Sequence, residues 1–388
     1  MSLSITQTPA EVNLAQSPII FTVSESTSVI NSSSFQYYAD LYYWIGTPNQ
    51  SGSVPQYTLV KYPNASNVGI FDVSKIINSV LTSSAQQNSS NVTYMAMDFY
   101  WQFLSGSTYV SSSKTKSLRY KGIDGYATFQ QPIGQEITSK SLHWPLMTSG
   151  PTTQSFFEDN KGNLTVYTGY AETFNVVPTR VVYSGSLGNG SIAVSGNLDT
   201  YSQTQYVPIG PAQSGFPLSA ASEWFTIQGY NVNVPLGKPI RFEYKCKQQY
   251  PNVRLKWKNA FGQFDWFNFD MVNRQSFTTT NRNYQPQIGT WQGSTLSYED
   301  YDSSNLNYIV DSKETITVNT DWVSQDYNNI FKQLLVSEEI YWVSDEANDT
   351  LEPITISTPS VEFKTGVVDK LIQYQFDFNR GQGYKLIL

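Results

Sequence analysis

The sequence has 388 residues and a formal net charge of −7, with 24 Lys and Arg against 31 Asp and Glu. Charged residues are 14% of the chain, against about 25% in an average protein, while aromatic residues reach 15%. This acidic balance argues against sequence-specific nucleic acid binding, which requires clustered Lys and Arg. A composition rich in tyrosine and neutral polar groups is typical of binding and assembly surfaces.

The rarest residue types restrict the catalytic chemistry. The one cysteine, Cys246, permits no intrachain disulfide and no multi-cysteine metal site, and its alternating surroundings predict a buried thiol in a strand. The one histidine, His143, stands beside Trp144 and Pro145, which favours a packed loop residue over a member of a catalytic triad. No Gly-x-Ser-x-Gly motif presents a nucleophile. We therefore expect no enzyme, no cofactor and no metal.

Paired carboxylates are the remaining catalytic alternative. Glu158, or Asp300 with Asp302, would supply the acid and base of a glycoside hydrolase. The cluster Glu299–Asp302 also carries oxygen ligands suited to Ca²⁺, although without the spacing of an EF-hand. Acidic loop residues are most often simply solvated, so the balance favours ordinary surface groups.

No apolar stretch approaches the roughly 18 residues needed to span a bilayer, so we expect no membrane insertion. The N-terminus has neither the basic nor the apolar region of a secretory signal. We expect synthesis in a reducing cytoplasm, with release by a route such as cell lysis.

Alternating apolar residues predict antiparallel strands in both halves of the chain. The three clearest segments are Phe35–Ile45, Met95–Phe103 and Ile372–Phe378. In each, every second side chain is apolar, as expected for a strand with one buried face. The expected fold class is mainly β, built from antiparallel β-sandwich-like domains with one short helix in each terminal half.

Helical spacing of apolar residues occurs in two places. One helix is expected over residues 72–84, with Asp72 as its N-cap, and the other over residues 321–336, after Asp321. Between the two regular ends, glycine and proline interrupt short strand segments. The expected organisation is therefore an N-terminal sandwich-like domain (1–130), a loop-rich β middle region (131–230) and a C-terminal sandwich-like domain (231–388).

The most distinctive local feature is an aromatic block over Leu255–Phe269, which predicts two short strands around a turn at Asn259–Gln263. Exposed on a hairpin, such rings would stack on sugars or bury in a neighbouring subunit. The candidate interface or glycan-stacking residues are Trp257, Phe261, Phe264, Trp266 and Phe267. The alternative is a hairpin packed on its own domain.

Segments at both ends of the chain carry a resemblance to a known group of proteins. They are Ile5–Pro9, Ser17–Val23, Gly69–Ser74, Leu255–Phe269, Val361–Thr365 and Asp369–Tyr374. Together they resemble virion structural proteins of tailed bacteriophages of Bacteroidetes hosts, including crAss-like phages. The resemblance implies a tail, neck or baseplate component, made in the host cytoplasm and placed in the virion. It also implies a homo-oligomeric ring in contact with neighbouring tail proteins, and it carries over no catalytic residue.

Two other functions remain open at this point. A receptor- or glycan-binding phage adhesin would use Trp257 and Trp266 to stack on sugar rings. A glycan depolymerase would use the carboxylates named above. The low charge and the absence of catalytic motifs favour the structural component.

Overall fold

The computed structural model describes most of the chain. The described residues are 3–45, 54–81, 83–84, 89–90, 92–128, 142–157, 161–169, 176–194, 204–219, 222–245, 250–345, 350–358, 360–365 and 372–381. Strands account for 53% of the structure and helices for 7%, which confirms the mainly β fold class. In these ranges no helix is long and apolar enough to cross a membrane.

The chain divides by its contacts into two compact units. The first unit contains Met1–Lys247, Lys256–Trp266 and Asp326–Glu338. The second unit contains Gln248–Leu255, Phe267–Gln325 and Glu339–Leu388. This division differs from the three parts expected at 1–130, 131–230 and 231–388. The strand Trp224–Asn231 runs through residue 230 and pairs with the following strand, so the middle sheet extends to Tyr244.

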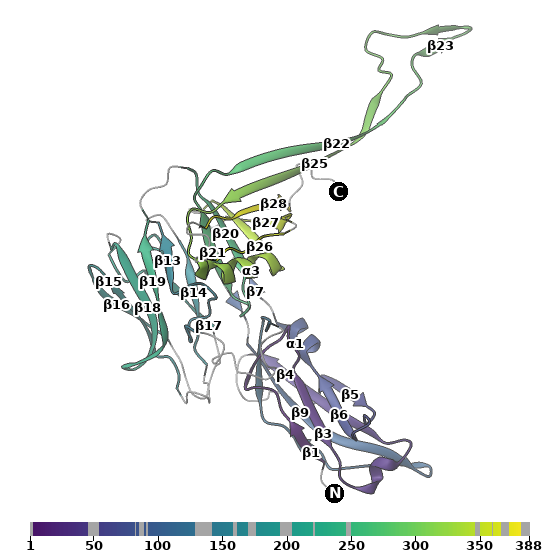
Figure 1. The fold of residues 1–388 in the computed structure, drawn as a ribbon. Coiled ribbons are helices and arrows are strands. Elements are labelled where there is room, and N and C mark those ends of the chain that lie inside the picture. The colour runs from purple at the N-terminus through teal and green to yellow at the C-terminus, as the bar shows by residue number, and fades with distance from the viewer. Residues whose placement is uncertain are drawn as a thin grey trace. The chain divides into compact units, whose positions relative to one another are not determined.

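Two facing sheets form the N-terminal part of the first unit (Figure 1). The smaller sheet consists of β1 (Ser4–Gln7), β3 (Ile20–Ser24) and β6 (Val68–Asp72). The larger sheet runs in the order β2 (Val12–Leu14), β12 (Tyr120–Ile123), β9 (Val92–Ser105), β4 (Gln36–Ile45) and β5 (Tyr57–Lys61), and β9 also pairs with β10 (Thr108–Ser111) and β11 (Thr115–Lys116). A separate short pair is β7 (Ser83–Ser84) with β8 (Ser89–Ser90).

The alternation seen in the sequence places the core between these sheets. Phe21 of β3 and Phe71 of β6 each lie 5.7 Å from Phe99 of β9, measured between ring centroids. Trp101 is buried two residues further along β9, and its indole Nε1 donates a hydrogen bond of 2.8 Å to the buried Glu25 carboxylate. The sandwich-like packing expected for this part of the chain is therefore present.

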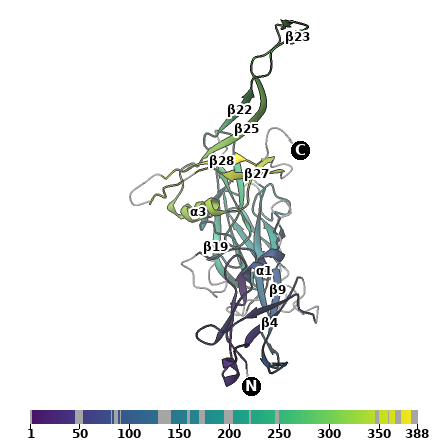
Figure 2. The same cartoon turned by 90° about the vertical axis from the view of Figure 1, so that its right-hand side faces the viewer.

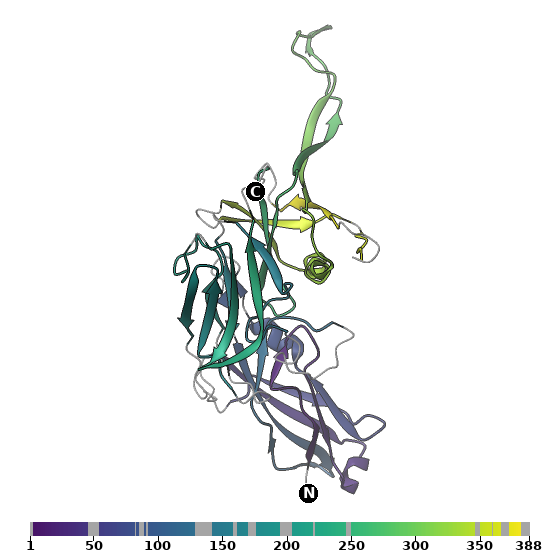
Figure 3. The same cartoon turned by 60° about the vertical axis from the view of Figure 1, so that its left-hand side comes forward.

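A second pair of sheets follows in the middle of the first unit (Figure 3). The larger one runs in the order β13 (Thr153–Phe156), β19 (Val234–Tyr244), β18 (Trp224–Asn231), β15 (Arg180–Gly185) and β16 (Gly188–Ala193), and the smaller pairs β14 (Asn163–Tyr167) with β17 (Thr204–Pro208). Val166 and Val207 of the smaller sheet share one buried core with Val181, Phe225 and Phe242 of the larger.

Most of the described strands of the second unit belong to one large sheet. Its order is β21 (Phe264–Phe269), β20 (Val253–Lys258), β26 (Ile340–Asp345), β27 (Thr350–Ile356), β28 (Gln375–Arg380), β25 (Leu306–Asn319) and β22 (Arg274–Tyr284). A further small pair is β23 (Thr290–Gln292) with β24 (Thr295–Ser297). Part of β20 and part of β21 belong to the first unit.

Both expected helices form, and both are shorter than predicted. α1 (Ser74–Val80) begins after β6, and the Asp72 carboxylate accepts the Ser74 N–H at 2.9 Å, which satisfies an N-terminal donor of the helix. α3 (Asn328–Val336) follows the 3-10 turn η2 (Gln325–Tyr327). It begins later than expected because Val323, which was predicted to be helical, forms an antiparallel bridge with Ile372. A further 3-10 turn, η1, spans Ser28–Asn31.

Candidate assembly surface

The hairpin predicted over Leu255–Phe269 forms as β20 and β21, joined by the turn at residues 259–263. Its aromatic residues lie mostly inside the protein: Trp257, Phe261 and Phe267 are buried, and Phe264 and Trp266 are partly buried. Phe261 packs in the first unit with Ile123, Trp144 and Met147. The candidate interface residues therefore offer at most partial ring faces to a partner or a sugar.

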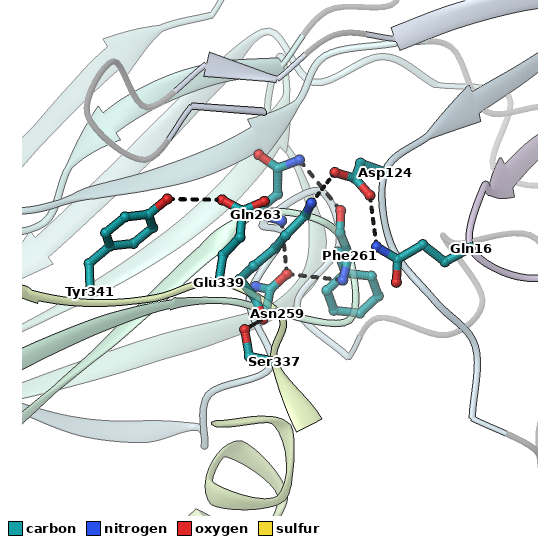
Figure 4. Close-up of polar contacts among 9 residues, drawn as sticks. Gln16, Asp124, Asn259, Phe261, Gln263, Ser337, Glu339 and Tyr341 are labelled. Carbon is teal, nitrogen blue, oxygen red and sulfur yellow. Dashed lines mark hydrogen bonds and ion pairs between the residues drawn. The ribbon is translucent and has the colours of Figure 1, made fainter. Parts of the chain in front are cut away.

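Polar contacts fix the turn of this hairpin (Figure 4). The Asn259 Oδ1 accepts the N–H groups of Phe261 and Gln263 at 2.9 and 3.0 Å, while its Nδ2 donates to the Met147 carbonyl at 3.2 Å. The buried Lys258 ammonium is paired with the buried Asp124 carboxylate, which also accepts a hydrogen bond of 3.2 Å from Gln16 Nε2. The hairpin turn is thus a built-in part of the first unit.

A small cavity lies beside this turn. Its volume is about 180 Å³, and it is lined by Gln16, Tyr126, Lys258, Asn259, Val336, Ser337 and Glu338. Sites for drug-sized ligands typically measure about 300–1,000 Å³. The lysine that lines the cavity already has the Asp124 carboxylate as its partner. This cavity is therefore a poor candidate for a sugar or cofactor site.

The residues weighed for catalysis are spread over the chain. His143 is 2% exposed, its Nδ1 lies 3.1 Å from the Lys238 carbonyl, and burial lowers the pKa of its imidazole, as expected for a packed neutral side chain. Cys246 and Glu158 lie outside the described residues. Asp300 and Asp302 are exposed in a turn.

Hydrogen bonds between Glu299 and Asp302 hold this turn together. Asp302 Oδ2 accepts the Glu299 N–H at 2.9 Å, and the Asp302 N–H donates to the Glu299 carbonyl at 2.9 Å. Across the described part of the chain, no three His, Cys, Asp or Glu side chains gather at a distance suited to a metal ion. The Asp302 carboxylate therefore stabilises its own turn on an exposed surface.

The most exposed element of the described chain is a two-stranded arm, which we define as Phe277–Glu314 (Figures 1 and 2). β22 pairs with β25 along its whole length, whereas β28 pairs with β25 only from Thr315 to Asn319. Residues 306–314 therefore pair with β22 alone among the described strands. At about 3.4 Å per residue, this two-stranded part is roughly 30 Å long.

The arm carries an unusual number of exposed apolar side chains. Every residue of β22 is exposed. Ten large apolar residues of the arm are exposed: Phe277, Tyr284, Ile288, Trp291, Leu296, Tyr298, Tyr301, Leu306, Tyr308 and Ile309. Tyr301 is 85% exposed, Tyr298 71% and Trp291 62%. Surface apolar residues gathered in this way mark interaction sites in soluble proteins.

Physical arguments also favour a partner for the arm. A single two-stranded hairpin is marginally stable in water, because it buries no core. Within the arm, the ring centroids of Tyr284 and Tyr308 lie 6.2 Å apart, next to a bulge that interrupts the register between Arg282 and Asn283. Burial of its apolar residues against another surface would supply the missing stabilisation.

The candidate interface residues expected from the sequence lie on β20–β21, whereas the exposed large apolar side chains lie on the arm. A usable signal was present over Arg274–Tyr284, where Thr, Ser, Asn and Arg separate the aromatic residues. A strand with this pattern has no continuous apolar face that could pack against a hydrophobic core.

No protein-family model matches the chain, and no curated protein is significantly similar to it in sequence.

Proposed function

We propose that this chain is a non-enzymatic structural component of a tailed-phage virion. It forms a ring in the tail, neck or baseplate by assembling with copies of itself and with adjacent tail proteins. The observation that carries the proposal is the exposed, aromatic-rich arm Phe277–Glu314, because it is built as an interaction surface rather than as a site for chemistry.

The composition supports the same function. With 14% charged residues, the chain has few strongly hydrated groups to desolvate when subunits associate. Its Tyr residues combine a large apolar area with a hydrogen-bonding hydroxyl, which suits permanent contacts between subunits. The resemblance to virion proteins of phages that infect Bacteroidetes is the basis for naming a virion as the assembly.

The first test is immunogold labelling of purified virions of the phage that encodes this chain, read by electron microscopy. We expect label at the neck or along the tail, at the same axial position in every particle. Digested virion proteins analysed by mass spectrometry should also contain peptides of this chain. Absence of the chain from intact and disrupted particles would overturn the proposal.

The second candidate function is a receptor- or glycan-binding adhesin. It is favoured by Trp291, Tyr298 and Tyr301 on the arm, since exposed rings of this kind stack on sugars. An adhesin would bind host surface polysaccharide with an affinity that falls in Trp291→Ala, and the label would lie on fibres. Equal binding by the natural chain and Trp291→Ala in calorimetry, or none by either, contradicts it. Trp257→Ala is unsuitable here because that side chain is buried.

A further inference from the structure

Both long sides of the arm are open strand edges. β22 is the last strand of the large sheet, and no described strand pairs with its outer side. On the other side of the arm, residues 306–314 of β25 pair with β22 alone among the described strands, because β28 pairs with β25 only from Thr315 onward. An open strand edge presents a row of main-chain N–H and C=O groups that can pair with another chain.

Each edge contains an uncharged run of residues that favour strands. Residues 275–281 of β22 read Gln-Ser-Phe-Thr-Thr-Thr-Asn, and residues 306–310 of β25 read Leu-Asn-Tyr-Ile-Val. Neither run contains a charged residue, a proline or a glycine, and β-branched and aromatic residues dominate both. A charge or a proline is a common protection of an exposed edge. Without one, a run of this kind promotes pairing between copies of the same chain.

The exposed rings of the arm supply enough area for such a contact. Six aromatic side chains are about half exposed or more: Phe277, Tyr284, Trp291, Tyr298, Tyr301 and Tyr308. At about 150–250 Å² for each buried ring, they leave roughly 550–950 Å² of surface for a partner. A standard-size interface takes about 800 Å² from each partner. Two arms side by side are equal in length and bring these rings together from base to tip, so a second copy of the chain supplies the whole contact.

β22 is poorly suited to pair with β22 of another copy. In an antiparallel pair centred on Thr278, Arg274 of each copy would lie opposite Arg282 of the other, and like charges directly opposite each other destabilise a ladder. The β25 edge avoids this repulsion over its uncharged run. When two arms point the same way, β25 of one runs antiparallel to β22 of the next, as it does to β22 of its own arm.

We propose that the arms of neighbouring copies pair edge to edge, β22 of one copy with residues 306–314 of β25 of the next. This inference rests on the proposed function, in which the chain assembles with itself, and it names the two strands that meet. The contact is heterologous, because each copy uses β22 toward one neighbour and β25 toward the other.

Repetition of this contact around a ring pairs every arm on both sides. The arms then form one continuous antiparallel sheet with two strands from each copy, and closure of the sheet leaves no open edge. The bulge between Arg282 and Asn283 fits this arrangement, since a bulge increases the local twist and bend of a strand.

Single lysine substitutions in the two runs test the contact in the full-length chain. Thr279→Lys and Ile309→Lys each place a charge in one uncharged run, which is how natural edge strands avoid pairing. In sedimentation velocity, each variant should self-associate at least about tenfold more weakly than the natural chain.

Thr355→Lys is the matched control. Thr355 is also exposed, but it lies on β27, which has β26 on one side and β28 on the other. The control should associate as the natural chain does. A natural chain that stays monomeric at every concentration, or an equal loss of association in the control and in the two edge variants, would overturn the proposal.

A mixture of the two edge variants separates this contact from a symmetric one. Thr279→Lys keeps its β25 edge and Ile309→Lys keeps its β22 edge, so an equimolar mixture should form a heterodimer and nothing larger. Native mass spectrometry with one variant ¹⁵N-labelled resolves the heterodimer. If Ile309→Lys dimerises with itself and the mixture contains no heterodimer, β22 pairs with β22 and the proposal is wrong.

Hydrogen exchange tests the contact without a substitution. As the natural chain associates, main-chain amides in peptides covering residues 274–284 and 306–314 should exchange at least about tenfold more slowly, because new main-chain hydrogen bonds protect them. Association with no added protection in these two segments would show that the copies meet elsewhere, which also overturns the proposal.

The two proposals fail separately. Label on virions with no effect of the edge variants would keep the structural function and remove the arm contact. Association through the arm edges of a chain that is missing from virions would keep the contact and remove the virion function.

Discussion

Two hairpins follow one another in the C-terminal half of the chain, and their aromatic residues have opposite surroundings. In β20 and β21, Trp257 and Phe269 are fully buried. In the arm that follows, Phe277 is 52% exposed and Trp291 62%. The same residue types therefore serve a core in one hairpin and a surface in the other.

The difference depends on the residues between the aromatic ones. β21 reads Phe-Asp-Trp-Phe-Asn-Phe, with rings on both faces, and a strand of this kind is buried on both sides. β22 reads Arg-Gln-Ser-Phe-Thr-Thr-Thr-Asn-Arg-Asn-Tyr, with polar side chains on both faces. Aromatic content alone thus predicts a strand, and the neighbouring residues predict whether it is buried.

The largest expected effect is the loss of a buried ring. Trp257→Ala should lower the free energy of unfolding by about 3–5 kcal/mol, since it removes a large side chain from the core. The same substitution at the exposed Trp291 should change it by less than about 0.5 kcal/mol. Urea unfolding of both variants checks the contrast, and equal losses would show that the arm is buried in the isolated chain.

The second effect concerns the buried ion pair at the first hairpin. Asp124→Leu leaves the buried Lys258 ammonium without its carboxylate and should cost about 3–5 kcal/mol in the free energy of unfolding. Asp124→Leu with Lys258→Met removes both charges and should cost clearly less. If the double variant is as unstable as the sum of the singles, the two residues do not act as a pair.

Two glycines with the same backbone conformation sharpen the comparison. Gly262 of the buried turn has φ +70°, and a Cβ there would lie 2.0 Å from the Asp124 carbonyl oxygen. Gly293 connects β23 and β24 on the arm with φ +63° and has nothing within 4 Å of such a Cβ.

Gly262→Ala should therefore cost about 2–4 kcal/mol in the free energy of unfolding, because it adds a clash to the strain of the left-handed conformation. Gly293→Ala should add only the strain, about 1–2 kcal/mol, confined to the tip of the arm. Chemical denaturation followed by tryptophan fluorescence checks both variants. A large global loss in Gly293→Ala would contradict an arm tip that stands in open solvent.

Local patterns predicted a large part of the fold and little of the site. Alternation located β4, β9 and β28, and the turn residues Asn259 and Gly262 located the β20–β21 hairpin. Contacts between distant segments have no local signature, so the parallel pairing of β13 with β19 could not be predicted. The Asp124–Lys258 ion pair could not be predicted either, because the sequence around each residue carries no sign that the other is its partner.

The smallest expected effect is a pH dependence of stability that comes from one buried carboxyl of the β20–β21 hairpin. Asp265 of β21 is buried, and burial raises the pKa of its carboxyl, although hydrogen bonds from Thr148 Oγ1 at 2.6 Å and the Ser149 N–H at 3.0 Å oppose this rise. Between the ordinary pKa of Asp and the raised one, the unfolded chain has lost this proton and the native chain keeps it. Folding then binds a proton, so the free energy of unfolding falls as the pH rises through that window.

Asp265→Asn removes this titrating carboxyl. As the pH rises from the ordinary pKa of Asp to the raised one, the free energy of unfolding of the variant should therefore increase relative to that of the natural chain. Thr148→Val removes a hydrogen bond that favours the ionised form of Asp265, so it should raise the pKa of this carboxyl further and extend the fall in stability to higher pH. Urea unfolding at a series of pH values measures both differences. A difference between Asp265→Asn and the natural chain that does not change with pH would show that Asp265 titrates alike in the native and unfolded states, and that its burial in the first hairpin has no electrostatic consequence.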